Sequence, residues 1–516
     1  MEGAISSRAE PELAWTLWNG KVYVPRQPEK TPLFKVVREY LETFLYEAEQ
    51  RSPLGNGVPE FVVEEFRRFL KCGALAGGFA RLKCETCGHE KLVPFSCKGR
   101  GLCPSCAGRR MTEIAIDQVE NIIPIVPVRQ WVLSLPYLLR YRMAYNHALT
   151  LKIHRIFWRC LEKHYRKKAE VMGIVGGKTG GITVIQRAGD ALNLNPHFHH
   201  SAVDGVFTEQ KSGKLRFHRV NAPTSDEVKE VARDIRKRTY RMLGVKRLGP
   251  EDGQMEDDPL AEEWPALAAA SAASVQSLVA FGERSGRRVL YAGEIPDLEE
   301  IEQPRPKRKR HARINGFDLH AGPAVQPNDR VKLEKLQRYL LRPPVPFSRL
   351  KELSDGRYSL KLKKAWRDGT SQVIFEPLEL LEKLAPIIPR PKTNQVIYSG
   401  VLAPNHRWRK RVVVYGREQP SAEADEPKKK EADPSRYIEW ADLLKRTLGV
   451  DALQCPKCFG QMKLVAMIEQ PDVIEKILDH LGLPTEKPRA LPARSPPDQE
   501  QLEIDCVDSD PDNYAE

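Results

Sequence analysis

The chain has 516 residues, 41% of them hydrophobic and 29% charged, which is the composition of a globular protein of roughly two to four domains. Its net charge of +13 favours a polyanionic partner such as nucleic acid, although the needs of solubility could also explain it. The N-terminus has no signal-peptide pattern, and no apolar run of about 18 residues or more predicts a membrane span. We therefore expect a cytoplasmic protein without a membrane partner, whose ten cysteines are metal ligands or free thiols rather than disulfides.

Hydrophobic periodicity predicts the main elements in chain order, after a polar, proline-punctuated lead-in at residues 1–30. Apolar residues recur at every third or fourth position in five segments, which predicts amphipathic helices at 32–51, 58–75, 147–172, 225–243 and 329–342. Strand patterns bounded by turn residues occur at 128–136, 180–189 and 196–207, and residues 356–375 alternate like a hairpin. A short polar turn separates 180–189 from 196–207, so these two strands are predicted to pair in an antiparallel hairpin.

Changes in composition mark the segments between these elements. Residues 249–312 combine an acidic stretch, an alanine-rich helical pattern and a basic run, and we interpret them as an insertion with helical and flexible parts. Residues 417–434 are predicted to be a charged linker. Beyond about residue 484 the proline- and acid-rich sequence predicts a disordered tail.

A cysteine cluster follows the second predicted helix. Cys84 and Cys87 form one CxxC pair, and Cys103 and Cys106 form another after fifteen intervening residues. Two such pairs supply the four thiolates of a tetrahedral structural site, so we predict Zn²⁺ on these four residues. A set of buried reduced cysteines would not explain the paired spacing.

Other potential zinc ligands are less clearly grouped. Cys97 and His89 lie between the two pairs and could replace one ligand or hold a second ion. A further CxxC pair, Cys455 and Cys458, would need two more ligands, for which His480 is a candidate. A plain turn with two free thiols explains that pair equally well.

Basic residues crowd the second CxxC pair of the cysteine cluster. Arg109 and Arg110 follow it directly, and Lys98 and Arg100 precede it. Because a closed four-ligand zinc site performs no chemistry, this segment is predicted to present basic side chains to DNA.

The strand at 196–207 carries three of the twelve histidines. Side chains alternate faces along a strand, so His197 and His199 share one face and His200 points to the other, where we expect a structural role. Two imidazoles side by side can hold one metal ion, and Mg²⁺ or Mn²⁺ accepts imidazole in sites built for phosphate chemistry. An ordinary strand with a polar face is the simpler alternative.

A catalytic metal would need a third protein ligand. The candidates are Gln186 on the preceding strand, Asp190 in the turn and His320 much later in the chain. The sequence does not choose between them.

The predicted helix at 329–342 carries a tyrosine beside its apolar stripe of Leu333, Leu336 and Leu340. Tyr339 flanks the stripe, and Arg338 and Arg342 lie close to it. Taken alone, such a tyrosine is more often a packed aromatic residue than a nucleophile. A phenol has a pKa near 10, so its attack on a phosphate needs a divalent ion and arginines to neutralise the developing charge.

These stretches together resemble the rolling-circle transposases of the bacterial insertion-sequence family ninety-one and its common-region relatives. The resemblance rests on their His-hydrophobic-His (HUH) motif in "LNLNPHFHHSAVDGVF", their catalytic-tyrosine segment in "RYLLRPPVPFSRL" and their zinc-binding domain in "FSCKGRGLCPSCAGRRM". The stretches "YSGVLAPNHRWR" and "ALQCPKCFGQMKLVAMI" are similar to their C-terminal part. The similar stretches occur in the same order over most of residues 35–480.

The resemblance implies a single-strand DNA endonuclease and strand transferase. Tyr339 would be the nucleophile that forms a 5′-phosphotyrosine link, and His197 and His199 would hold Mg²⁺ or Mn²⁺, with Gln186 as a third ligand. Arg109, Arg110, Arg338 and Arg342 would contact DNA. Two-tyrosine members carry a second tyrosine four residues upstream, but here that position is Lys335, which favours the single-tyrosine branch. The partners would be single-stranded DNA at element ends and target and, because no phosphate-binding loop motif is present, a host helicase in the bacterial nucleoid.

The implied fold class is α+β, with an antiparallel-sheet HUH domain flanked by helices. The predicted domain order follows the chain: lead-in 1–30, helical and zinc-binding DNA-binding domain 31–125, HUH catalytic domain 126–350, β-rich C-terminal extension 351–416, linker 417–434, CxxC segment 435–483 and tail 484–516. Two alternatives stay open at this point. A replication initiator or relaxase would use the same chemistry, and a non-catalytic zinc-dependent DNA-binding protein would use the histidines and the tyrosine only for structure.

Overall fold

The computed structural model of the protein is a mixed α+β structure, as predicted. It describes residues 15–16, 22–23, 27–53, 55–246, 258–294, 309–345, 347–366, 368–417, 451 and 453–494. Most of the lead-in, parts of 249–312, the linker beyond residue 417 and the tail beyond residue 494 lie outside these ranges. Within the described residues, no helix is long and apolar enough to span a membrane.

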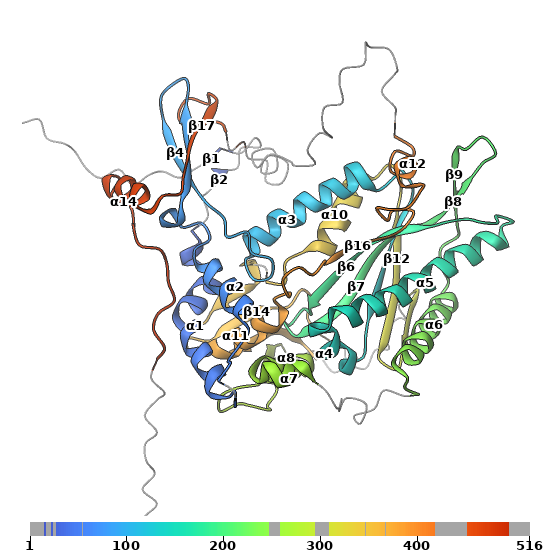
Figure 1. Ribbon diagram of the computed structural model, residues 1–516, viewed down its shortest axis with the longest axis horizontal. Helices are drawn as coiled ribbons and strands as arrows, with labels where there is room; N and C mark the ends of the chain where they lie inside the picture. The colour runs from blue at the N-terminus through green and yellow to red at the C-terminus, as the bar shows by residue number, and fades with distance from the viewer. Residues whose placement is uncertain are drawn as a thin grey trace, which may run out of the picture.

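A six-stranded antiparallel sheet forms the centre of the structure (Figure 1). Its strands lie in the order β11 (His311–Ile314), β12 (Phe317–Val325), β5 (Val128–Ser134), β7 (Leu194–Val203), β6 (Gly180–Ala188) and β16 (Val396–Gly400). The predicted antiparallel hairpin is present as β6 and β7. The second predicted strand breaks at Asp204, after which β8 (Gly205–Glu209) pairs with β9 (Leu215–Arg219) in a separate sheet. The break has a physical cause, because the buried Asp204 carboxylate accepts two hydrogen bonds from Arg129 of β5.

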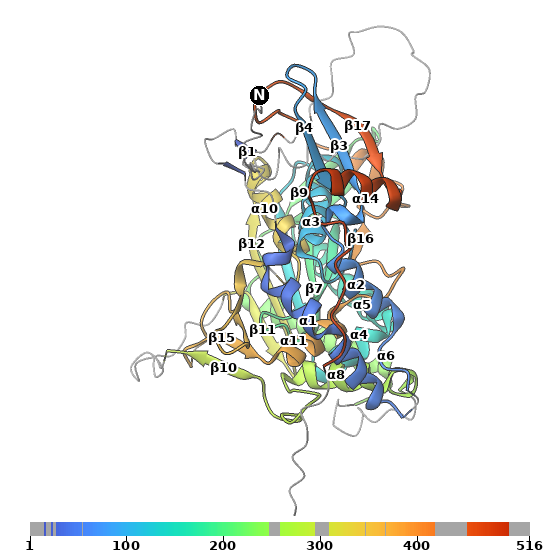
Figure 2. The same ribbon diagram turned by 90° about the vertical axis from the view of Figure 1, so that its left-hand side faces the viewer.

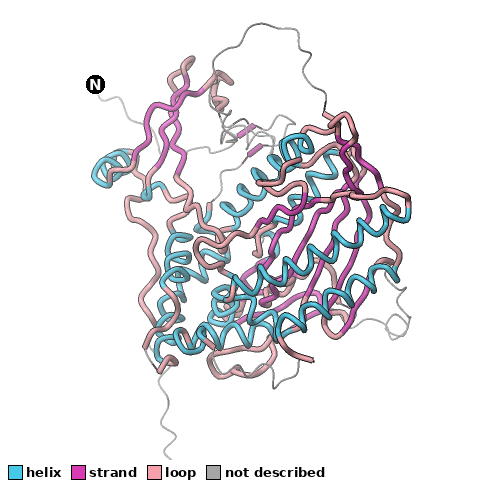
Figure 3. Tube along the Cα trace, turned by 45° about the vertical axis from the view of Figure 1, so that its right-hand side comes forward, coloured by secondary structure: helices cyan, strands magenta, loops and turns pink. Residues whose placement is uncertain are grey.

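The central sheet buries its two faces against different helices. Alternate residues such as Trp131, Phe198 and Leu319 pack against α5 (His147–Val171) and α6 (Ser225–Leu243), which run along one face (Figure 3). The opposite face packs residues such as Ile182 and Val128 against α10 (Arg330–Leu341). Helix α3 (Pro104–Asp117) contacts α10. Since side chains of a strand alternate faces, β7 presents one set of residues to the α5–α6 core and the other set to α10.

A second hydrophobic core contains the N-terminal helices of the chain. It joins α1 (Pro32–Gln50), α2 (Glu60–Leu70), α8 (Pro265–Gln276) and α11 (Pro377–Leu384) to a sheet in the order β10 (Leu290–Gly293), β15 (Thr370–Phe375), β14 (Tyr358–Lys361) and β13 (Leu350–Glu352). The predicted hairpin at 356–375 is β14 and β15. The alanine-rich helical pattern predicted within residues 249–312 is confirmed as α8, and the interpretation of the whole segment as an insertion stays a prediction. Helix α8 is buried in this core and β10 is an edge strand of its sheet, so both belong to the fold.

Several further strands and α-helices of the described residues are short. They are β1 (Trp15–Thr16) paired with β2 (Val22–Tyr23), α4 (Tyr137–Tyr145), α7 (Pro259–Glu263) and α12 (Arg409–Val413).

The N- and C-terminal parts of the chain meet in a three-stranded sheet of β17 (Met462–Ile468), β3 (Phe79–Cys84) and β4 (Glu90–Pro94), with α14 (Pro471–His480) beside it (Figure 2). The segment predicted as a separate unit at 435–483 therefore completes the N-terminal zinc-binding region. The prediction of a disordered tail was wrong for residues 484–494, which run along α1. There the backbone N–H of Leu491 donates to Arg38, and the Arg494 guanidinium lies 4.0 Å from the ring centroid of Tyr40.

Candidate active site and metal centres

The HUH histidines lie on β7, in the middle of the central sheet. His197 and His199 point to the face covered by α10, and their Nε2 atoms are 3.1 Å apart. Both rings are buried. Burial lowers the pKa of His197 to about 4 and the pKa of His199 well below its usual range, so both imidazoles are neutral and keep a lone pair for a metal.

Hydrogen bonds to the other ring nitrogens orient the pair. The Nδ1–H of His197 donates to the carbonyl oxygen of Asn195 over 2.6 Å, which leaves Nε2 as the free ligand atom. The amide nitrogen of Gln130 on β5 lies 2.9 Å from Nδ1 of His199. Nε2 of His199 is the ligand atom when this amide is turned so that its oxygen accepts the Nδ1–H. Such partners fix the orientation of metal-binding imidazoles. The donor set of this face therefore fits a divalent ion.

His200 lies on the opposite face of β7, as the alternation predicted. Its Nδ1 is 2.7 Å from Thr183 Oγ1, which also contacts His154 of α5. Burial lowers the pKa of His200 to about 3. This histidine is thus a neutral, packed part of the core between the sheet and α5.

Tyr339 lies on α10 at the edge of the histidine pair. Its ring centroid is 5.8 Å from that of His199, and the residue is 46% exposed, so it is accessible to a substrate. The apolar stripe predicted for this helix is buried at Leu333 and Leu340, which leaves the tyrosine on the helix flank. Gln186 holds the end of α10 in place, because its amide nitrogen donates to the Leu340 carbonyl over 2.5 Å.

The three candidates for a third ligand lie in different surroundings. Gln186 is directly opposite His197 in the β6–β7 pairing, but its amide nitrogen is occupied by α10. Asp190 pairs with Arg349 at 2.9 Å, and His320 lies two strands away in register with His199 through Val132. Among the described residues, no His, Cys, Asp or Glu completes a three-ligand group with the pair. Gln186 as a metal ligand stays a prediction that depends on its amide oxygen.

Cationic side chains surround the Tyr339 ring. The guanidinium of Arg342 lies 4.4 Å from its centroid and the ammonium of Lys363 lies 5.6 Å away. Burial and the nearby Arg342 lower the pKa of Lys363 to about 8. Arg338 faces Glu334, with which it forms an i,i+4 ion pair. Sequence reasoning missed Lys363 because it comes from the segment after β14, where nothing in the local pattern links it to the tyrosine.

The cysteines form two four-thiolate clusters, and the predicted grouping of Cys84, Cys87, Cys103 and Cys106 was wrong. One cluster contains Cys72, Cys97, Cys103 and Cys106, and the other contains Cys84, Cys87, Cys455 and Cys458. In each, all four sulfur atoms lie within 4.8 Å of one another. Each predicted CxxC pair takes its partners from elsewhere, because β3 carries Cys84 away from the start of α3, where Cys103 and Cys106 lie.

The sulfur separations fit tetrahedral zinc sites. Thiolates bound to one Zn²⁺ at about 2.3 Å are about 3.8 Å apart. Here Cys84 and Cys458 are 3.4 Å apart, and Cys72 and Cys106 are 3.7 Å apart. A hydrogen bond from the Cys87 backbone is the main cause that lowers the pKa of Cys84 to about 6, which favours the thiolate that zinc binding requires.

Two family models match the chain, one over the zinc-binding region and one over the region from β6 to β16. Residues 37–135 match the family model described as "Transposase zinc-binding domain", and residues 180–410 match the one described as "Putative transposase". The chain belongs to the insertion-sequence ninety-one family of transposases. It is 24% identical to the transposase for insertion sequence element IS801 of Pseudomonas savastanoi pv. phaseolicola over 421 residues, which cover 80% of this chain and 85% of that protein. No solved structure matches the chain.

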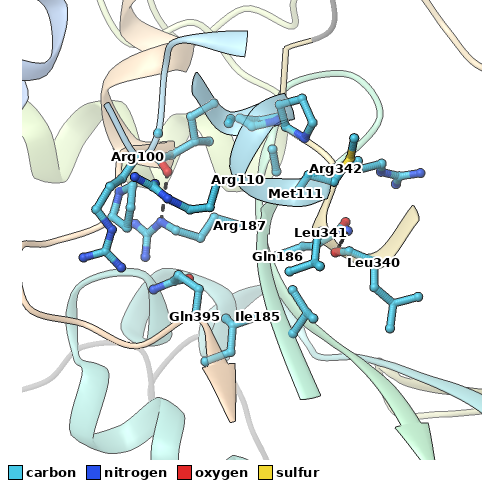
Figure 4. A pocket seen from close by; sticks show the side chains of 18 of the residues that line it. Arg100, Arg110, Met111, Ile185, Gln186, Arg187, Leu340, Leu341, Arg342 and Gln395 are labelled. Carbon is cyan, nitrogen blue, oxygen red and sulfur yellow. Dashed lines mark hydrogen bonds between the residues drawn. The ribbon is translucent and has the colours of Figure 1, made fainter. Parts of the chain in front are cut away.

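As a transposase, the chain is a DNA-processing enzyme that binds DNA, and its Cys₄ clusters support Zn²⁺. Two of the arginines predicted to contact DNA, Arg110 of α3 and Arg342 after α10, line one pocket between the zinc-binding region and the central sheet (Figure 4). Arg109 lies one position earlier on α3, and Arg338 lies one turn before Arg342. The fold thus brings basic residues of two transposase regions to the neighbourhood of Tyr339.

Proposed function

We propose that this transposase nicks and rejoins single-stranded DNA through a 5′-phosphotyrosine intermediate on Tyr339 during rolling-circle transposition. The observation that carries the proposal is the position of the exposed Tyr339 ring 5.8 Å from His199, on the sheet face where the Nε2 atoms of His197 and His199 meet. A relaxase or replication initiator would use the same chemistry, but the family match favours transposition.

The chemistry follows from the surroundings of the tyrosine. The phenol oxygen attacks the scissile phosphorus, the bond from phosphorus to the 3′-oxygen breaks, and the phenol gives up its proton while the leaving oxygen gains one as a 3′-hydroxyl. Arg342 and Lys363 stabilise the charge on the phosphate. A divalent ion such as Mg²⁺ or Mn²⁺ on His197 and His199 supplies Lewis-acid polarisation of the phosphate oxygens when bound. Rejoining is the reverse, with a 3′-hydroxyl attacking the phosphotyrosine.

One covalent link forms at a time in this proposal. Lys335, which is exposed on α10 one turn before Tyr339, occupies the position where two-tyrosine relatives carry their second nucleophile. Unwinding of the donor strand would fall to a host helicase, because the sequence has no phosphate-binding loop motif.

The test is a search for the covalent adduct. Purified protein is mixed with Mn²⁺ or Mg²⁺ and single-stranded oligonucleotides that carry the element ends, and a denaturing gel detects a protein–DNA band. We expect Tyr339→Phe to abolish the band and His197→Ala/His199→Ala to lower its rate by on the order of 100-fold or more. Tyr46→Phe is the matched control, since Tyr46 is 45% exposed and lies on α1, away from the histidines.

An adduct that persists in Tyr339→Phe would contradict the assignment of the nucleophile. DNA binding that depends on zinc, without any adduct in the unaltered protein, would instead identify a non-catalytic DNA-binding protein.

A further inference from the structure

A pocket of about 520 Å³ opens beside the C-terminal end of the tyrosine helix (Figure 4). Its walls come from α3, from the end of β6, from residues 340–344 after Tyr339 and from the stretch that leads into β16. The zinc-binding region, the central sheet and the C-terminal extension therefore meet at this one cavity. Its volume lies in the range of about 300–1,000 Å³ that is usual for pockets that bind small organic groups.

The lining combines apolar side chains with basic ones. Met111, Ile114, Ile185 and Leu341 supply apolar surface. The charged residues are mostly basic: Arg100, Arg110, Arg187, Arg342, Arg349 and Lys363. The one acidic residue among those that line the pocket, Asp190, lies 2.9 Å from Arg349 and 3.9 Å from Lys363. Such a lining suits a planar, apolar group that is attached to phosphates.

Two cationic residues that line the pocket also lie beside Tyr339, the proposed nucleophile. Arg342 and Lys363 line the cavity and also lie 4.4 and 5.6 Å from the centroid of the Tyr339 ring. A phosphate held by these two cations at the tyrosine therefore has its neighbouring nucleotide next to the pocket mouth.

Amide groups at the pocket can read the edge of a base. Asn394 and Gln395 line it beside β16, and the Gln395 amide nitrogen donates to Thr393 Oγ1 over 3.2 Å. This hydrogen bond fixes the amide and leaves its carbonyl oxygen as an acceptor. Asparagine and glutamine amides are common partners of base edges in DNA recognition.

We infer that this pocket binds an unstacked base of single-stranded DNA, from the nucleotide next to the scissile phosphate. The inference rests on the proposed function and adds the site where the enzyme would read its strand. Single-strand binding proteins combine cations that track the backbone with surfaces that receive unstacked bases, and the pocket has both. A base that is stacked in a duplex would have to leave the helix to enter it.

Photocrosslinking tests the inference. The full-length Tyr339→Phe protein, which cannot be consumed by adduct formation, is bound to a 20-nucleotide oligo-dT that contains 4-thiothymidine, irradiated and digested with trypsin. We expect mass spectrometry to place crosslinks on Met111 or Ile114, within the tryptic peptide 111–129. These side chains belong to α3 and line the pocket.

A pair of substitutions on one helix provides the control. Ala107→Phe places a ring in the pocket, whereas Gly108→Phe adds the same ring at a position where a Cβ meets nothing within 4 Å. We expect Ala107→Phe to remove the crosslinks on Met111 and Ile114 and to weaken oligo-dT binding by about tenfold, the effect of losing one base contact. Gly108→Phe should retain both. An unchanged zinc content shows that each variant is folded.

Crosslinks that map only outside the pocket in the Tyr339→Phe protein overturn the inference without any variant, and so do pocket crosslinks that survive in Ala107→Phe. Failure of the proposed function looks different: the protein with Tyr339 forms no adduct, while crosslinks to Met111 or Ile114 persist.

Discussion

Lys363 and Arg342 both lie against the Tyr339 ring, and in the proposed reaction both would meet the phosphate that the tyrosine attacks. Because burial and Arg342 lower the pKa of Lys363 to about 8, its ammonium loses its proton as the pH rises through about 8. If the cation is the active form, the adduct rate of the unaltered protein should fall above that pH. In Lys363→Arg the fall should disappear, since a guanidinium stays protonated there. Single-turnover adduct assays between pH 6 and about 10 measure both profiles.

Lys363→Met should lower the adduct rate at pH 7, whereas Lys361→Met, on the exposed side of β14, should leave it unchanged. A rate that climbs through pH 8 and depends on Lys363 would contradict the cationic role, because a neutral amine acting as a base has the opposite pH dependence.

Gln130 orients His199 and is expected to tune metal binding without touching DNA. In Gln130→Leu, the contact of 2.9 Å to His199 Nδ1 is lost, and the imidazole is free to turn. We expect the Mn²⁺ concentration for half-maximal adduct formation to rise by about 10- to 100-fold, which is the usual effect of removing such a partner. Excess Mn²⁺ should restore the maximal rate. If Gln130→Leu has the same Mn²⁺ dependence as the unaltered protein and the control Gln276→Leu on α8, Gln130 has no role in metal binding.

Strand alternation and helix periodicity are local, so they placed His197 and His199 on one face of a strand and Tyr339 on the flank of a helix. The assignment of these residues and Arg342 to one site came from the resemblance to the transposase family. Lys363 and Gln130 were not predicted from the sequence, since each reaches the site from another strand or from the segment after β14, through pairing that no local pattern specifies. The position of Gln186 opposite His197 followed from the predicted hairpin. Its hydrogen bond to the end of α10 could not be predicted from the sequence.

At the scale of elements, the buried ion pair between Arg129 and Asp204 ties β5 to the end of β7. Both side chains are almost fully buried, at 3% and 1% exposure, and they meet in two hydrogen bonds of 2.8 and 2.7 Å. Asp204→Asn keeps the shape but leaves the Arg129 charge uncompensated. We expect the free energy of unfolding to fall by about 3–5 kcal/mol, as measured by urea denaturation followed by circular dichroism.

The control for this pair is Asp355→Asn, which breaks the exposed ion pair with Arg357 and should leave stability unchanged. If the two variants unfold at the same urea concentration, the buried pair does not hold the sheet together.

Element prediction succeeded where the pattern was long and periodic, as in α1, α5, α6 and α10, and where a polar turn joined two apolar strands, as in β6 and β7. The hairpin of β11 and β12 was missed, although its turn carries the signal of Asn315-Gly316, both with positive φ, at 47° and 81°. Such an Asn-Gly turn between strands is a strong local hairpin signal. The basic run before this turn was interpreted instead as part of an insertion with flexible parts.

At the scale of the whole molecule, the cysteine clusters show what spacing cannot reveal. A CxxC pair supplies two ligands, but which other pair completes the site depends on tertiary structure. Cys84 and Cys87 are joined by Cys455 and Cys458, about 370 residues later, because β17 pairs with β3 in the three-stranded sheet. The cluster that contains Cys97, Cys103 and Cys106 also includes Cys72. This cysteine follows α2 and does not belong to a CxxC pair in the sequence.

The two clusters therefore predict two zinc ions per chain. The ion in the cluster of Cys84, Cys87, Cys455 and Cys458 would join the C-terminal segment to the N-terminal region. Metal analysis should find two Zn²⁺ in the unaltered protein and in Cys160→Ser, whose buried cysteine belongs to neither cluster, but one in Cys455→Ser/Cys458→Ser. Because zinc binding is coupled to the folding of its ligands, that variant should also release β17. Hydrogen–deuterium exchange should then speed up at the β3 amides that pair with β17, while those that pair with β4 stay protected longer. A variant that retains two ions and normal exchange in β3 would show that the C-terminal cysteines hold no zinc and that strand pairing alone joins the two parts of the chain.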